Sequence, residues 1–83
     1  MLTGESRRVA DAAKRLYELE YRPILEKTHW GEFVCIEPDS GDYFLGKTFD
    51  DAVNKAIDAH PDRLTHTLRV GHAAALHLGA MIQ

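Results

Sequence analysis

The chain has 83 residues, of which 45% are apolar and 28% are charged, and its formal net charge is −3. This length allows one domain with a modest core, and the composition excludes a disordered chain. We therefore predict a single domain over residues 1–83, with a helical segment 1–28, a core 29–79 and a tail 80–83.

The compartment follows from two further features of the sequence. Apolar runs such as residues 73–76 are far shorter than the about 20 residues that a membrane-spanning helix needs, and the first residues lack the apolar stretch of a secretory signal. The single cysteine, Cys35, has no second cysteine with which to form a disulfide. We expect a cytoplasmic protein that does not associate with membranes.

The first predicted element is an amphipathic helix over residues 6–20, with Ser6 as its N-terminal cap. Its inner stripe is predicted to consist of Val9, Ala13, Leu16 and Glu20, with Ala12 and Leu19 beside them. Because Pro23 cannot continue a regular helix, the helix either kinks within residues 19–22 or stops there. A short strand over residues 21–27 is the alternative.

A β-hairpin follows the helical segment. Residues 33–36 are apolar at every position, which predicts a strand that is covered on both faces. Residues 38–42 are rich in turn formers, with Asp39-Ser40-Gly41 at their centre, and residues 43–45 resume the strand pattern. We therefore assign the acidic residues of this segment to a turn.

A second amphipathic helix is predicted to begin after Thr48, whose hydroxyl can cap its first turn, and to end before Pro61. Its buried stripe is predicted to consist of Phe49, Ala52, Val53, Ala56 and Ile57. Residues 64–70 alternate in polarity, which predicts a strand whose buried face consists of Leu64, His66, Leu68 and Val70. Residues 75–78 form either a fourth strand or an apolar tail.

Together these elements predict an α+β fold of the order α-β-β-α-β-(β). The second helix lies across a mainly antiparallel sheet of three or four strands, because its apolar stripe has no other surface to cover. The N-terminal helix is then free to cover the second face of the same sheet or to pair with another copy of the chain.

Metal chemistry is one alternative function. His60, His66, His72 and His77 are six, six and five residues apart, and no pair has the spacing of a zinc site. A metal-binding or small hydrolytic module would have to combine His66, His72 and His77 with the acidic turn through tertiary contacts. We assign no metal, no cofactor and no catalytic residue, and we favour a protein without enzymatic activity over this alternative.

Two kinds of macromolecular partner are considered. Exposed aromatic and arginine side chains are typical of protein interfaces, and the predicted protein-binding residues are Tyr17, Tyr21, Trp30, Arg69 and His72. A nucleic-acid-associated regulator is the second alternative, and its binding residues would be Arg7, Arg8, Lys14, Arg15 and Arg22. Acidic residues alternate with these bases, so we do not expect the chain alone to bind nucleic acid.

Two resemblances accompany these patterns. Residues 22–26, 29–43, 61–62 and 69–72 resemble a family of small uncharacterised bacterial proteins, to which no activity is attached. Residues 33–39 and 46–57 are similar to the hairpin and helix of HicB-like antitoxins, which have partial ribonuclease-H-like folds and silence a small ribonuclease toxin.

The antitoxin resemblance implies a bacterial, non-catalytic module that binds a toxin-like protein and is often dimeric. The chain departs from those antitoxins in its long N-terminal helix and in lacking a carboxy-terminal DNA-binding module. We therefore predict a homodimeric protein-binding module and do not extend the resemblance to operator DNA.

Overall fold

The computed structural model describes residues 4–72. Its elements in chain order are α1 (Gly4–Leu16), the π-helical segment η1 (Tyr17–Tyr21), α2 (Arg22–Thr28), β1 (Phe33–Glu37), β2 (Asp42–Gly46), α3 (Phe49–Ala59) and β3 (His66–Arg69). The predicted α+β fold class is confirmed. The strand considered for residues 75–78 lies outside the described range.

β1 is the central strand of the sheet. It pairs antiparallel with β2 on one side and with β3 on the other. In this register Cys35 lies between Phe44 and Thr67, and all three of Val34, Cys35 and Ile36 are 0% exposed. The unbroken apolar run 33–36 thus indicated correctly that the strand is covered on both faces.

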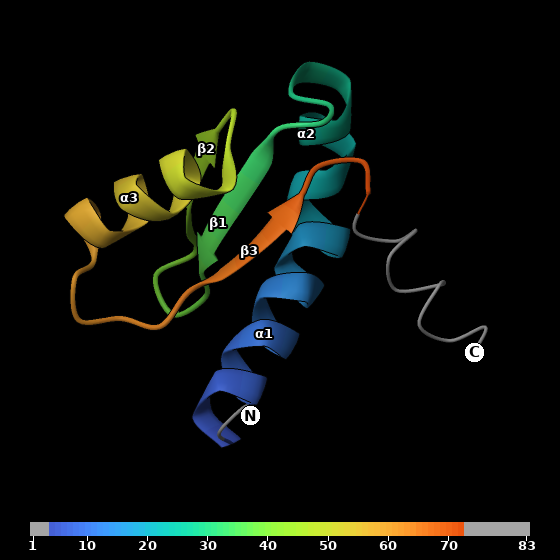
Figure 1. The fold of residues 1–83 in the computed structure, drawn as a ribbon. Helices are drawn as coiled ribbons and strands as arrows, with labels where there is room; N and C mark the ends of the chain where they lie inside the picture. The colour runs from blue at the N-terminus through green and yellow to red at the C-terminus, as the bar shows by residue number, and fades with distance from the viewer. Residues whose placement is uncertain (1–3, 73–83) are drawn as a thin grey trace, which may run out of the picture.

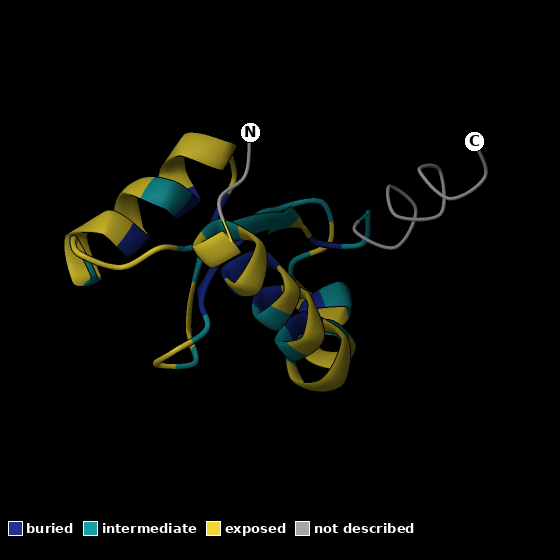
Figure 2. Cartoon of the chain, turned by 90° about the horizontal axis from the view of Figure 1, so that it is seen from below, coloured by how far each residue is buried: buried dark blue, intermediate teal, exposed yellow. Residues whose placement is uncertain are grey.

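Helices provide the cover on both faces of the sheet, as Figure 1 shows. On one face, the buried cluster consists of Ala13, Tyr17, Leu25, Val34, Ile36 and Val70. On the other face, Cys35 packs against Ala52 and Ala56 of α3. The N-terminal helix therefore covers its own sheet, giving three layers, and Figure 2 shows the buried positions of α1 and α3 turned toward the sheet.

The helical segment continues through Pro23, so the alternative strand over residues 21–27 is wrong. In η1 the helix widens, and the N–H of Arg22 donates to the carbonyl of Tyr17, five residues earlier. Pro23 then lies in the first turn of α2, where a missing N–H is tolerated. At the other end α1 already includes Gly4, so Ser6 lies inside the helix rather than at its cap.

The wider turn also changes which residues face the sheet. Every fourth residue from Val9 to Leu25 lies on the inner side, and Tyr17 is only 1% exposed. The Tyr17 hydroxyl donates to Glu26 Oε2 at 2.9 Å and accepts from the N–H of Gly71 at 3.2 Å. Tyr17 is thus a core residue, and the prediction that it is partly exposed is wrong. Leu19, predicted beside the inner stripe, is 73% exposed.

α3 has the predicted ends but a narrower buried face. The Thr48 hydroxyl accepts from the N–H of Asp51 at 3.1 Å, and the helix ends at Ala59. Ala52 and Ala56 are fully buried, whereas Phe49 and Ile57 are 53% and 52% exposed. The predicted stripe was too wide, and Leu64, predicted to be buried in the next strand, is also exposed.

A close approach between α3 and β2 explains the exposed side chains. A Cβ atom at Gly46 would lie 2.5 Å from the backbone nitrogen of Ala52 and 2.6 Å from the Cβ atom of Asp51. The helix backbone therefore rests directly on the strand, where only small side chains fit. Phe49 and Ile57 are left at the flank of the helix.

We expect Gly46→Ala to lower the free energy of unfolding by at least about 2 kcal/mol, because the added methyl group has to push α3 away from β2. Urea denaturation followed by circular dichroism measures this change. Gly4→Ala is the matched control, since a Cβ atom there meets nothing within 4 Å, and it should be neutral or slightly stabilising. Wild-type stability of Gly46→Ala would contradict the close approach.

Candidate functional site

The candidate site lies at the end of the sheet where β1 begins and β3 ends. The N–H of Gly31 donates to the carbonyl of Val70 at 2.9 Å, and the N–H of Val70 donates to the carbonyl of Glu32 at 2.7 Å. Two residues of one segment thus oppose a single residue of the other, which is the pattern of a β-bulge. This bulge places Trp30 beside the end of β3, with 61% of its surface exposed.

Trp30 rests on the turn that follows β3. A Cβ atom at Gly71 would lie 2.7 Å from the indole ring, and the backbone φ of Gly71 is +85°, so both features favour glycine here. The imidazole of His72 lies beside the indole, with 5.9 Å between the ring centres. The exposed Trp30 and the half-buried His72 therefore form one pair.

A second group of side chains lies at the same end of the sheet. The guanidinium carbon of Arg69 is 5.7 Å from the centre of the Phe33 ring, and Arg69 Nε donates to the carbonyl of Gly31 at 3.0 Å. Phe33 in turn meets the edge of Phe49 at 6.2 Å. Within residues 4–72 no carboxylate pairs with Arg69.

We call these five residues the aromatic surface: Trp30, Phe33, Phe49, Arg69 and His72. Three of them were predicted as protein-binding residues from the sequence. Phe33 and Phe49 were missed because each fits the apolar pattern of its own element. The signal available in the sequence is their position, since each is the first residue of its strand or helix, where the neighbouring element covers it incompletely.

The other two predicted protein-binding residues lie elsewhere. Tyr21 is half-buried, its hydroxyl donates to the carbonyl of Gly41, and its ring centre is 4.7 Å from that of Tyr43. Tyr17 is buried in the core. Neither side chain belongs to the aromatic surface.

The acidic turn is organised by a buried carboxylate. Glu37 is 1% exposed, and its oxygens accept from the N–H of Asp39 at 2.9 Å and from the N–H of Ser40 at 3.0 Å. Asp39 pairs with Arg63 at 3.1 Å, and Asp42 contacts His60 at 2.8 Å. These carboxylates are therefore occupied by the protein's own donors.

The histidines of the metal alternative do not meet in the described range. His66 begins β3 and pairs with Ile36, whereas His72 lies beyond the opposite end of the strand; His77 is outside the described residues. Burial and the nearby Lys14 lower the pKa of His66, partly offset by Asp11. Among residues 4–72, no three His, Cys, Asp or Glu side chains are grouped closely enough to hold a metal ion.

The bases of the nucleic-acid alternative are partly neutralised. Arg8 pairs with Glu5 at 2.7 Å and with Asp39 at 3.6 Å. Arg22 pairs with Glu18 at 2.7 Å and with Glu26 at 3.2 Å. Arg7, Lys14 and Arg15 remain exposed on α1.

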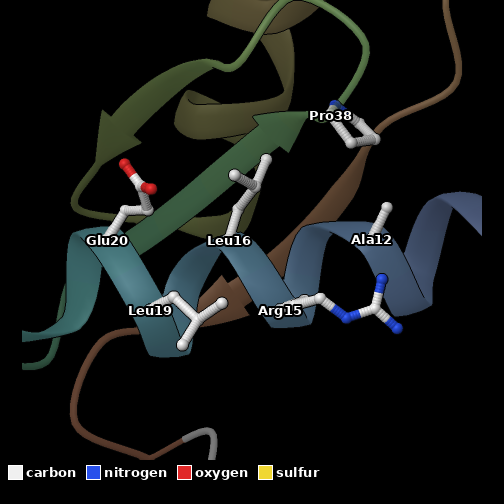
Figure 3. Close-up of a pocket in the computed structure, with 6 residues that line it drawn as sticks. All are labelled: Ala12, Arg15, Leu16, Leu19, Glu20 and Pro38. Atoms are coloured by element: carbon white, nitrogen blue, oxygen red, sulfur yellow. The ribbon is translucent and has the colours of Figure 1, made fainter.

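A shallow hollow of about 240 Å³ lies between the helical layer and Pro38, which follows β1. Figure 3 shows its lining, with Pro38 facing a row of α1 and η1 residues that consists of Ala12, Arg15, Leu16, Leu19 and Glu20. The lining contains one base, Arg15, and one acid, Glu20, so its charge favours neither an anionic nor a cationic ligand.

Comparisons with known proteins add no assignment. The chain matches no protein-family model, no curated protein and no solved structure. Both resemblances drawn from the sequence therefore stay predictions. Within residues 4–72, none of the helices has the length and apolar character required to cross a bilayer.

Glu37, the buried carboxylate of the acidic turn, makes the stability of the fold depend on pH. Burial raises the pKa of Glu37, but the hydrogen bonds from Ser40 and Asp39 and the charge of Arg63 outweigh it, so the pKa lies below its ordinary value of 4.5. A carboxylate with a lowered pKa stabilises the fold above its unfolded pKa, and this contribution is lost as the pH falls through the folded pKa.

We expect Glu37→Gln to cost about 1–3 kcal/mol at pH 7, because the amide group turns a donor toward one of the two backbone N–H groups. The difference from wild type should shrink as the pH falls below 4.5, because the unfolded carboxyl then becomes protonated while the native one stays ionised down to its lower folded pKa. Urea unfolding at pH 7 and at pH 3.5 measures both values, with the exposed Glu20→Gln as control. A pH-independent difference would refute this account of the turn.

Proposed function

We propose that the chain is a non-catalytic, cytoplasmic protein-binding module of bacterial origin, and that it acts as a homodimer. The aromatic surface is the part of the chain that meets the partner. The observation that carries this proposal is the exposure of large aromatic side chains at one end of the sheet, beside an arginine that pairs with no carboxylate of residues 4–72.

Composition and rigidity support a role in binding. Tryptophan and arginine are enriched among the residues that dominate protein interfaces, and here Trp30 is 61% and Phe49 is 53% exposed. Arg69 is held by the carbonyl of Gly31 and the ring of Phe33, so little side-chain entropy remains to be lost on binding. Such a surface suits a partner that offers apolar side chains together with a carboxylate.

The antitoxin resemblance suggests a small toxin-like protein as the partner. The similar residues include all of β1, Gly46 of β2 and most of α3, and these three elements make up the hairpin-and-helix unit that the resemblance concerns. A cytoplasmic location is supported by Cys35, a free thiol that is completely buried in the core.

A capture experiment tests the proposal. Tagged wild-type protein should enrich one specific partner from a lysate of its native host, as quantified by mass spectrometry against an untagged control. We expect Trp30→Ala and Arg69→Ala each to reduce the recovered partner at least tenfold, since both truncate central contact residues.

Leu19→Ala is the matched control, because Leu19 is the most exposed large apolar side chain on the helical layer and is not part of the aromatic surface. This variant should recover the partner at the wild-type level. Circular dichroism verifies that all variants are folded. Failure to enrich any protein, or undiminished capture by folded Trp30→Ala and Arg69→Ala, would reject the aromatic surface as the binding site.

A further inference from the structure

The turn that follows β3 supports part of the aromatic surface. The N–H of His72 donates to the carbonyl of Arg69 at 3.0 Å, which closes a four-residue turn over residues 69–72. Trp30 packs on the third residue of this turn, Gly71, where a Cβ atom would lie 2.7 Å from the indole ring. The conformation of the turn therefore determines where Trp30 and His72 lie.

The central peptide group of the turn joins Val70 to Gly71 and is held from two directions. Its carbonyl accepts from the N–H of Gly31, in the β-bulge, at 2.9 Å. Its N–H donates to the hydroxyl of Tyr17, in the helical layer, at 3.2 Å. Because the peptide group is trans, its carbonyl and N–H point in opposite directions, so each hydrogen bond holds one side of it.

Glycine alone does not fix this peptide group. Gly71 has a φ of +85°, but glycine adopts positive and negative φ about equally readily, so the turn depends on hydrogen bonds from outside. Tyr17 is well placed to supply one of them, since its side chain is 1% exposed. The single hydroxyl hydrogen is donated to Glu26 Oε2 at 2.9 Å, which leaves the lone pairs of the oxygen for the Gly71 N–H.

We propose that Tyr17 is a positioning residue for the aromatic surface. Its hydroxyl, acting through the N–H of Gly71, holds Trp30 and His72 in the arrangement that meets a partner. The consequence for binding rests on the protein-binding function proposed above, whereas the link between the hydroxyl and the turn stands on its own. The ring of Tyr17 packs in the buried cluster, so phenylalanine would keep the packing and remove the positioning group.

Tyr17→Phe tests the hydroxyl with two local readouts. We expect the amide hydrogen of Gly71 to exchange at least about tenfold faster in the variant, measured by NMR relative to the amide of Cys35 in the central strand. Trp30 is the single tryptophan of the chain, so its fluorescence reports on this turn directly. Its quenching by acrylamide should increase and its anisotropy should fall, because the indole no longer rests on a fixed turn.

Tyr21→Phe is the matched control. It removes the same atom from the same helical segment, but the hydroxyl of Tyr21 donates to the carbonyl of Gly41, in the turn between β1 and β2. Exchange at Gly71 and quenching of Trp30 should therefore stay at the wild-type level. Comparison with the Cys35 amide ensures that a general loss of stability does not imitate the effect.

Glu26→Ala is a second variant, which decides the matter if Tyr17→Phe does not fold. It leaves the hydroxyl in place but removes the acceptor that orients it, so both readouts should change in the same direction by a smaller factor. Wild-type exchange and quenching in folded Tyr17→Phe would overturn the proposal. Equal changes in Tyr21→Phe would overturn it as well.

The capture experiment described above separates this proposal from the proposed function. Tyr17→Phe should recover at least about threefold less partner than wild type, since only molecules with the turn in place bind, and Tyr21→Phe should recover the wild-type amount. A released turn with undiminished capture would overturn the positioning role and leave partner binding intact. A released turn in a protein that captures no partner would support the link between Tyr17 and the turn alone.

Discussion

Burial of β1 on both faces is the constraint on which the rest of the structure depends. Val34, Cys35 and Ile36 are all completely buried, so each face of the strand requires its own cover. Within residues 4–72, the helical layer that begins with α1 covers one face and α3 covers the other. The N-terminal helix is therefore an integral layer of the fold, which is why the sheet is enclosed without the help of another copy.

The two covers are built in different ways, and the difference determines what is left exposed. α1 reaches the sheet with Tyr17, a large side chain whose hydroxyl also ties the helix to Glu26 and to the turn at Gly71. α3 reaches it with alanines and lies so close to Gly46 that no Cβ atom fits between them. Large side chains on α3 consequently move to its flank, where Phe49 joins Phe33 and Arg69.

The sequence patterns predicted those features of the fold that depend on neighbouring residues in the chain. The cap at Thr48, the turn around Gly41, a strand at β3 and the two-sided burial of residues 33–36 are all present. The errors arise where helix geometry or interlayer distance decides. The burial of Tyr17 depends on the π-helical segment η1, after which Pro23 lies in the first turn of α2. No pattern in the sequence predicted this wider turn. The exposure of Phe49 and Ile57 depends on a glycine in another element.

The same reasoning explains why only part of the candidate site was predictable. Trp30, Arg69 and His72 were recognised by residue type, whereas their juxtaposition depends on the bulge that sets Gly31 and Glu32 against Val70. The position of α3 also matters. This helix lies mainly over β2 and β1, and its Lys55 reaches the carbonyl of Leu45 on β2. Within residues 4–72, this position of α3 leaves β3 with less cover from the helix than β1 and β2 have. Packing of the core thus determines on which side of the sheet this protein has surface free for a partner.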